Sequence, residues 1–160
     1  MTVQEFVRLI GPVFEHSPWI AERAAMQRPF SILDELHRAL CETVEHAEET
    51  EKLDLIRAHP DLVGRAAQQG TLTAESSNEQ ASAGLKELTP EEIETFQNLN
   101  ARYREKFEFP FVICARLNKK EAMLSGFHSR LNHSRDAEIK IALDEIFKIA
   151  RLRLRDLVQA

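Results

Sequence analysis

Apolar residues recur along most of the chain at the spacing of an α-helix. Ile32, Leu36, Leu40 and Val44, for example, follow one another at intervals of four residues. This spacing brings side chains to one face of a helix, where they can pack against a core. Ala, Leu, Glu, Lys, Arg and Gln dominate and only 5 glycines occur, so local preference also favours helix. The pattern predicts an all-α protein.

Helix start and stop signals divide this pattern into segments. Thr2 with Glu5 has the pattern of a capping box, and Thr89 with Glu92 gives a second box in which Pro90 occupies the first turn. Helix ends are predicted at Pro29, at Pro60 and at the glycines at 11, 70 and 84. The expected helices begin at about residues 2, 18, 31, 50, 61, 73, 89, 118 and 134, and the last of them runs to about Leu157.

Residues 109–115 break the helical pattern. Because this stretch is apolar, aromatic and β-branched, it favours extended backbone, and we expect it to run through the core. No internal repeat or long linker interrupts the chain. The sequence therefore predicts one domain over residues 1–160, built as a compact multi-helix bundle with one short buried extended segment at about 109–115.

Charge and cysteine content narrow the class of protein. The net charge is −5 with Lys and Arg dispersed among acids, so no nucleic-acid partner is expected. Cys41 and Cys114 form no CxxC zinc motif and fit a reducing compartment. No apolar run approaches the roughly 20 residues that cross a bilayer. Neither a signal peptide nor a peroxisomal address is recognisable. We expect a cytoplasmic protein without a membrane partner.

His59 is the first candidate for chemistry. It stands directly before Pro60, whose fixed φ makes the chain turn at a defined angle. A histidine held there, at a helix end, can face a cleft. The alternative is that Asp61 caps the next helix and His59 is a surface or capping residue.

A polar run over residues 76–80 is the second candidate. Ser76, Glu79 and Gln80 have the spacing i, i+3, i+4, which places them on one helical face. Such a face could orient a small polar ligand. The alternative is an ordinary solvated face.

Arg153 is the third candidate, because it interrupts an apolar stripe of the last expected helix. Ile146, Ala150 and Leu157 share its face, whereas Arg151 falls off the stripe. A buried arginine needs a partner, which could be an internal carboxylate or an anionic substrate. The alternative is that its long stem carries the charge out to water.

No other residues suggest a metal site or a nucleophile. Cys114 lies in an apolar stretch, where the pKa of a thiol rises and its reactivity falls. The spacing of the remaining histidines does not suit a ligand pair, and we treat them as structural or surface residues: His16, His37, His46, His128 and His133.

Five motifs of this chain also occur, in the same order, in one known family. They are Arg57-Ala58-His59-Pro60-Asp61-Leu62, the run from Leu72 to Ala81, Leu99-Asn100 with Tyr103, the run from Phe109 to Arg116, and Ile149-Ala150-Arg151-Leu152-Arg153-Leu154. Each motif alone is weakly specific, but the ordered set is specific. Over nearly its whole length the chain resembles 2-oxo-4-hydroxy-4-carboxy-5-ureidoimidazoline (OHCU) decarboxylase.

The resemblance implies an all-helical homodimer that uses neither a metal nor an organic cofactor and forms (S)-allantoin in urate degradation. It implies that His59 is the catalytic acid and that Glu79 and Arg153 complete the catalytic set, with periodicity favouring Arg153 over Arg151. The implied substrate contacts are Pro60, Ser76, Glu79, Gln80, Phe111, Val112, Ile113, Cys114, Ala115 and Arg153.

Two other functions remain open at this point. The chain could be a non-catalytic helical binding module in which His59 and Arg153 serve only the structure. It could also be a hydrolase of a ureido compound in the same pathway, although such enzymes usually need a metal or a nucleophile. Glu79 could take part in proton transfer or only position the reacting groups.

Overall fold

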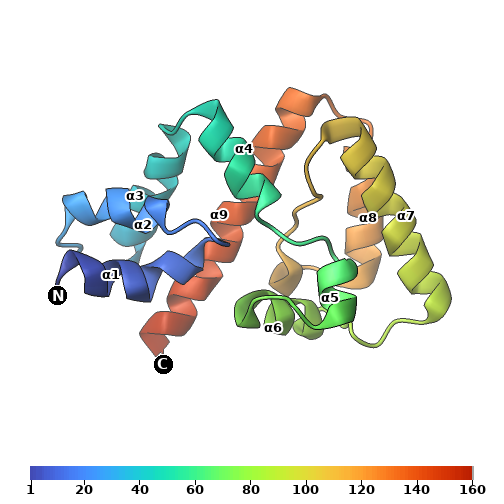
Figure 1. The fold of residues 1–160 in the computed structure, drawn as a ribbon, viewed down its shortest axis with the longest axis horizontal. Coiled ribbons are helices and arrows are strands. Elements are labelled where there is room, and N and C mark those ends of the chain that lie inside the picture. The colour runs from blue at the N-terminus through green and yellow to red at the C-terminus, as the bar shows by residue number, and fades with distance from the viewer. Residues whose placement is uncertain (160) are drawn as a thin grey trace. The chain divides into compact units, whose positions relative to one another are not determined.

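The computed structural model describes residues 1–159, apart from the side chain of residue 66. Within these residues all regular structure is helical, which confirms the predicted all-α class (Figure 1). The helices are α1 (Val3–Ile10), α2 (Trp19–Ala24), α3 (Leu33–Glu45), α4 (Glu49–Arg57), α5 (Arg65–Gln69), α6 (Ala74–Ser82), α7 (Pro90–Phe107), α8 (Lys120–Arg130) and α9 (Arg135–Gln159). Short 3-10 turns cover Gly11–Val13, Ala25–Gln27 and Ala115–Leu117.

Side-chain caps explain where several helices begin. The capping boxes of Thr2 with Glu5 and of Thr89 with Glu92 are both formed, as predicted. The hydroxyl of Thr73 accepts a hydrogen bond from the N–H of Ser76, which caps α6. These starts are local properties of the sequence, so they could be predicted from it.

Three of the predicted helices are present but begin at slightly different residues. The helix expected from about residue 31 begins at Leu33, and the one expected from about residue 50 begins at Glu49, where Glu48 forms a capping box with Glu51. The helix expected from Asp61 to about Gln69 does end at Gln69 but begins only at Arg65. The physical reason lies in the four residues before Arg65, which form a tight turn in which Val63 has a φ of 55°. A left-handed residue cannot continue a right-handed helix.

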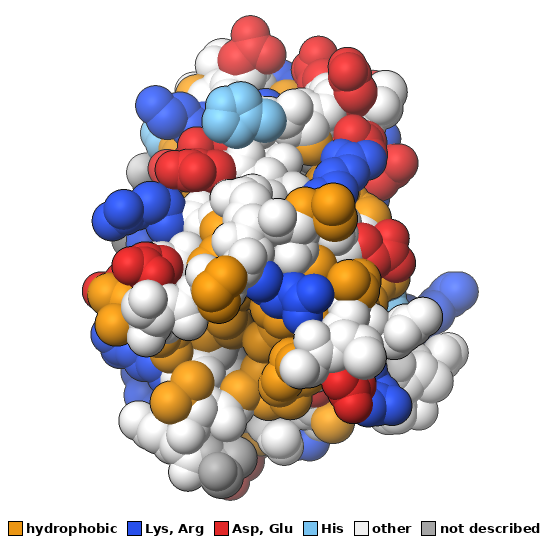
Figure 2. Space-filling view, turned by 90° about the vertical axis from the view of Figure 1, so that its left-hand side faces the viewer, with side chains coloured by type: hydrophobic (Ala, Val, Ile, Leu, Met, Phe, Trp, Pro, Cys, Tyr) orange, Lys and Arg blue, Asp and Glu red, His pale blue; other side chains and the backbone are white. Residues whose placement is uncertain are grey.

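The chain forms two compact units, which are described separately. The first comprises residues 1–58 and the C-terminal part of α9 from residue 147. In this unit α2 packs against α1 and α3. An imidazole nitrogen of His37 on α3 lies 2.8 Å from the carbonyl oxygen of Phe147 on α9. Figure 2 shows hydrophobic side chains gathered between charged ones on one face of the molecule.

The second unit comprises residues 59–146 and is organised around aromatic side chains. The ring centroid of Tyr103 lies 4.5 Å from that of Phe107 and 5.3 Å from that of Phe111. Phe111 stacks on Phe127 with ring centroids 3.8 Å apart. This cluster packs α7 against α8, which run side by side in Figure 1.

Residues 110–114, between α7 and the turn at Ala115–Leu117, carry no regular secondary structure. Pro110, Phe111, Val112 and Cys114 are buried and Ile113 is half-buried. No helix among residues 1–159 is long and apolar enough to cross a membrane.

Candidate active site

His59 opens the second unit, immediately after α4 and its cap at Ala58. Only 6% of the surface of His59 is exposed to solvent, so His59 is not a surface residue. As predicted, the helix ends before the proline that follows. His59 is therefore the first residue of an irregular segment over residues 59–64, which we call the His59 loop.

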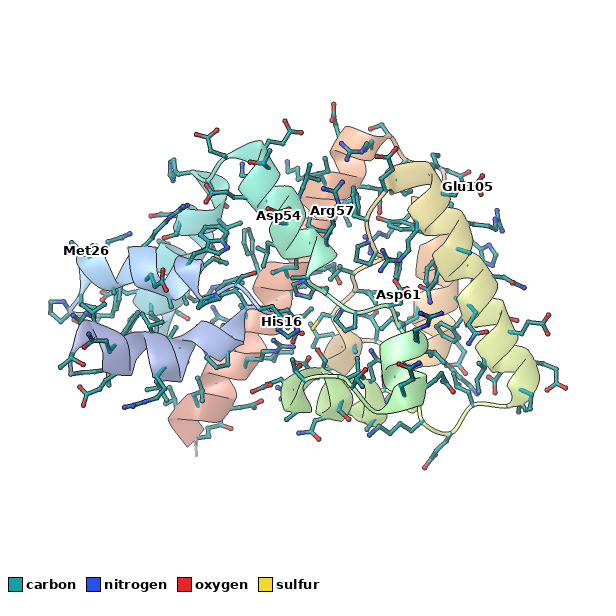
Figure 3. All side chains as sticks on the ribbon, in the orientation of Figure 1. His16, Met26, Asp54, Arg57, Asp61 and Glu105 are labelled. Carbon is teal, nitrogen blue, oxygen red and sulfur yellow. The ribbon has the colours of Figure 1, made fainter. Side chains whose placement is uncertain are left out.

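Three side chains from distant parts of the second unit hold the His59 loop. The amide of Gln80 on α6 accepts a hydrogen bond from the N–H of Val63 at 3.2 Å and donates one to the carbonyl of Asp61 at 3.3 Å. Asn100 on α7 donates to the carbonyl of Leu62 at 2.8 Å. Arg104 binds the carboxylate of Asp61, which lies near the first turn of α5 (Figure 3), at 3.0 Å. The loop is therefore fixed from two helices.

The backbone of the turn restricts which residue types can occupy positions 63 and 64. Val63 adopts a left-handed conformation, which is unusual for a β-branched residue and costs about 1–2 kcal/mol. A Cβ atom at Gly64 would lie 2.6 Å from the Cβ of Asp61, so only glycine fits there. Strain of this kind persists where surrounding contacts enforce it. Here the contacts from Gln80 and Asn100 do so.

The predicted polar face of α6 is present, but it is not a solvated face. Ser76 is 5% and Gln80 4% exposed, while Glu79 is half-buried. The hydrogen bonds of Gln80 are directed at the His59 loop, so this residue has a structural task that the sequence did not suggest. Helix α6 also packs against the turn at Ala115–Leu117.

The residues from Phe111 to Ala115 form the next part, here called the 111–115 segment. Its carbonyl at Val112 accepts a hydrogen bond from Arg130 at 2.7 Å, and its N–H at Cys114 donates one to Glu145 at 3.0 Å. Burial, with the nearby carboxylates of Glu145 and Glu79, raises the pKa of the Cys114 thiol. This direction agrees with the expectation that Cys114 is not a nucleophile.

Arg130 is part of a buried network that sequence reasoning missed. It donates to Glu138 at 2.8 Å, and Glu138 also accepts a hydrogen bond from the hydroxyl of Tyr103. The second carboxylate oxygen of Glu138 lies 2.9 Å from an imidazole nitrogen of His133. Burial and the bond to Glu138 raise the pKa of Tyr103, which keeps its hydroxyl a donor.

Arg153 lies in the first unit and is 5% exposed, so its charged end is buried and the alternative, a stem that carries the charge out to water, is wrong. Of the two partners considered for it, the structure shows a carboxylate. Its guanidinium donates to Glu15 at 2.9 Å and to the carbonyls of Pro12 and Val13 at 3.3 and 3.4 Å. Arg151, which falls off the stripe, is half-exposed and binds Asp34 at 2.8 Å.

The second unit thus brings together three of the predicted pieces: the His59 loop, the face of α6 and the 111–115 segment. Sequence reasoning missed the residues that hold these pieces in place. A signal existed for Arg130, because Met123, Phe127 and Arg130 have the same helical spacing that singled out Arg153. Asn100, which lies in a motif quoted above, as well as Arg104 and Glu145, have partners at least 31 residues away, so no periodic spacing links them to these partners. Glu138 is only eight residues from Arg130, but no local pattern pairs the two.

Among residues 1–159 no group of His, Cys, Asp and Glu side chains is arranged to hold a metal ion. A buried histidine opens a loop that is bonded to the polar face of α6, and α6 packs against the end of the 111–115 segment. An all-helical protein with buried polar groups gathered in this way belongs to the class of helical proteins with a candidate small-molecule site.

Comparison with known proteins identifies the family. The family model for OHCU decarboxylase matches residues 1–155. The 2-oxo-4-hydroxy-4-carboxy-5-ureidoimidazoline decarboxylase of Haloferax volcanii is 46% identical over 151 residues, covering 94% of this chain and 88% of that protein. The mouse protein of the same name is 42% identical over 160 residues, covering 100% and 90%. The chain belongs to the OHCU decarboxylase family, whose members are carboxy-lyases.

Further relatives agree with this assignment. The uric acid degradation bifunctional protein PucL of Bacillus subtilis is 40% identical, covering 99% of this chain and 31% of that protein. A crystal structure of (S)-allantoin synthase superposes with a TM-score of 0.78 at 27% identity, covering 98% of this chain and 51% of the other. A crystal structure of OHCU decarboxylase in the presence of (S)-allantoin, at 22% identity and a TM-score of 0.73, shares the fold and covers 88% and 91%.

Proposed function

We infer that this chain decarboxylates 2-oxo-4-hydroxy-4-carboxy-5-ureidoimidazoline to (S)-allantoin in urate degradation. The observation that carries this conclusion is the match, over nearly the full length of both chains, to decarboxylases of that name at 46% and 42% identity. It favours a lyase over the two other functions considered, a non-catalytic binding module and a ureido-compound hydrolase. The burial of His59 on a fixed loop supports the same choice.

The reaction sets modest demands on the protein. The bond between the ring and the carboxylate breaks, and its electron pair moves toward the adjacent C=N bond, so the substrate itself takes up the electrons. One proton must then reach the ring carbon that carries the ureido group, from one face only. The enzyme has to bind an anion, favour the loss of its charge and deliver that proton.

His59 is proposed as the proton donor. An imidazole titrates near neutral pH and can therefore give up a proton under physiological conditions. Because the His59 loop is tied to α6 and α7, its imidazole would meet the ring from a fixed direction. Free decay of the substrate gives both enantiomers, whereas a proton from one direction gives one.

The remaining predicted contacts are proposed to bind and orient the ring. Glu79 would orient the imidazole of His59 or accept hydrogen bonds from the ureido group, and Arg153 would donate to a substrate oxygen through its forked guanidinium. The other proposed contacts are Pro60, Ser76, Gln80, Phe111, Val112, Ile113, Cys114 and Ala115.

We also propose that the protein acts in the cytoplasm as a homodimer. Several large hydrophobic residues of the first unit are exposed, and a second copy of this chain would cover them. They are Met1, Val3, Leu9, Met26, Ile32, Leu157 and Val158. Sedimentation equilibrium should give twice the mass of 18.4 kDa, and a monomer at every concentration would contradict the proposal.

The activity can be tested on freshly oxidised urate, after hydrolysis of the first product. Circular dichroism should show rapid growth of the (S)-allantoin signal with the protein and none without it. An unchanged signal, together with unaltered disappearance of the substrate, would contradict the proposed function.

A further inference from the structure

The main-chain N–H and C=O of Ile113 differ from the main-chain groups of its two neighbours in the chain. Within residues 1–159 no group forms a hydrogen bond with either of them, although Val112 and Cys114 on both sides are bonded. Ile113 is half-buried, so part of this residue is accessible at the surface of the core. One donor and one acceptor on the same residue match the –NH–CO– edge of a cyclic amide or ureide.

Arg130 sets the direction of the donor. In a trans peptide the C=O of one residue and the N–H of the next point in opposite directions. The carbonyl of Val112 points at Arg130, whose guanidinium nitrogen lies 2.7 Å away. The N–H of Ile113 must therefore point away from Arg130.

Glu145 sets the direction of the acceptor in the same way. The N–H of Cys114 points at a carboxylate oxygen of Glu145, 3.0 Å away. The C=O of Ile113 belongs to the same peptide unit, so it points away from Glu145. Two charged side chains thus fix the two peptide units that flank Ile113.

Arg130 is itself held firmly. Its Nε donates to Glu138 at 2.8 Å, and its guanidinium carbon lies 4.2 Å from the ring centroid of Phe111. Glu138 is fully buried and Arg130 is 7% exposed. A planar guanidinium bonded on two edges and stacked on a ring has little freedom to turn. The direction of its hydrogen bond to the carbonyl of Val112 is therefore fixed.

We propose that Arg130 and Glu145 are positioning residues, which turn the N–H and C=O of Ile113 toward the –NH–CO– edge of the substrate. This inference rests on the proposed function for the identity of that substrate. Neither residue needs to touch the substrate, since each acts through a main-chain bond of the 111–115 segment. Their loss should therefore affect orientation of the ring, and with it the enantiomer formed.

The test removes the bond to Val112 without leaving a buried charge. In the double variant Arg130→Met with Glu138→Gln, no unpaired carboxylate remains and the glutamine oxygen can still accept from Tyr103. Arg135→Met is the matched control. Arg135 also donates to a main-chain carbonyl, that of Phe107 at 3.2 Å, and lies over a ring, that of Phe109, but outside the 111–115 segment.

The double variant should lose about 10- to 100-fold in kcat/KM, as expected for a small misplacement of reacting groups, with a lower excess of (S)-allantoin. The control should keep both wild-type values. A folded double variant with wild-type kcat, KM and enantiomeric excess would overturn the proposal.

Glu145 gives a second test, which decides the matter if the double variant does not fold. Glu145→Gln keeps an oxygen acceptor for the N–H of Cys114, whereas Glu145→Ala removes it. The glutamine variant should retain wild-type enantiomeric excess and the alanine variant should lose it. Equal behaviour of the two variants, whether both intact or both impaired, would contradict a role through the hydrogen bond.

Hydrogen exchange separates this proposal from the proposed function, because it needs no substrate. The amide of Cys114 should exchange slowly in the wild type and in Glu145→Gln, and at least tenfold faster in Glu145→Ala, which lacks the acceptor. Unchanged exchange in Glu145→Ala would overturn the positioning role of Glu145, even for an active enzyme. Altered exchange with an inactive wild type would overturn only the assigned activity.

Discussion

Arg130 in the second unit and Arg153 in the first are both buried and both paired with a glutamate. Arg130 is 7% and Arg153 5% exposed, and their bonds to Glu138 and Glu15 measure 2.8 and 2.9 Å. Their surroundings differ. Arg130 lies over Phe111 and makes a short main-chain bond of 2.7 Å. Arg153 reaches two carbonyls at 3.3 and 3.4 Å.

The comparison shows that burial of an arginine does not by itself identify a substrate contact. Of the two, Arg130 has its charge, its main-chain bond and its ring stacking all within one aromatic cluster, which is typical of a structural role. Arg153 has a matched carboxylate but weaker main-chain bonds, and it lies in a motif of the OHCU decarboxylase family. We therefore assign the first to positioning of the main chain and keep the second as the proposed substrate contact.

Replacing Arg130 alone should have the largest effect. Arg130→Met leaves the carboxylate of Glu138 buried beside Tyr103 without its cation, which should cost about 3–5 kcal/mol of unfolding free energy. Urea unfolding followed by circular dichroism measures this. A loss below about 1 kcal/mol would mean that the pair of Arg130 with Glu138 contributes no more than an exposed ion pair does. The comparison of two buried arginines would then no longer hold.

Arg153→Lys should separate the two arginines. Lysine keeps the charge beside Glu15 but not the forked donors, so kcat/KM should fall about 100-fold while the protein stays folded. Steady-state kinetics on the decarboxylation, with a thermal unfolding curve as control, test this. If activity survives and only stability drops, Arg153 is a structural residue like Arg130.

Two glycine substitutions compare the His59 loop with helix α8. Gly64→Ala would force a Cβ to 2.6 Å from that of Asp61 and should cost about 1–3 kcal/mol while distorting the His59 loop. Gly126→Ala is the matched control, because its Cβ would meet Phe111 and Ile113 at 3.5 and 3.6 Å, which is ordinary contact. In a helix that change should stabilise the protein by about 0.5–1 kcal/mol. Equal effects on unfolding would contradict the geometry of the loop.

The smallest effect is expected for Arg151→Met. Its pair with Asp34 is largely exposed, with side chains 37% and 56% accessible, and exposed pairs contribute about 0–1 kcal/mol. Urea unfolding should barely distinguish the variant from the wild type. A loss comparable to that of Arg130→Met would mean that exposure does not separate the arginines of this chain.

Local patterns predicted the parts of this structure that depend on local physics. Thr2 and Thr89 cap helices because the glutamates three residues on complete the box, and Arg153 is buried because its helix turns it inward. The turn before α5 escaped prediction because the left-handed Val63 is stabilised by Gln80, 17 residues away.

The residues that hold the site escaped for the same reason. Asn100 meets Leu62 across 38 positions of the chain, and Glu145 meets Cys114 across 31. Neither spacing leaves a periodic mark in the sequence. Helical starts and buried faces could therefore be predicted, whereas the hydrogen bonds that fix the His59 loop and the 111–115 segment required coordinates.

The most direct test of the account compares His59→Ala with His128→Ala, an exposed histidine of α8, on freshly generated substrate. With His59 as the proton donor, the first variant should stay folded and give racemic allantoin at the uncatalysed rate, while the second gives (S)-allantoin like the wild type. Formation of (S)-allantoin by His59→Ala at the wild-type rate would contradict the central claim.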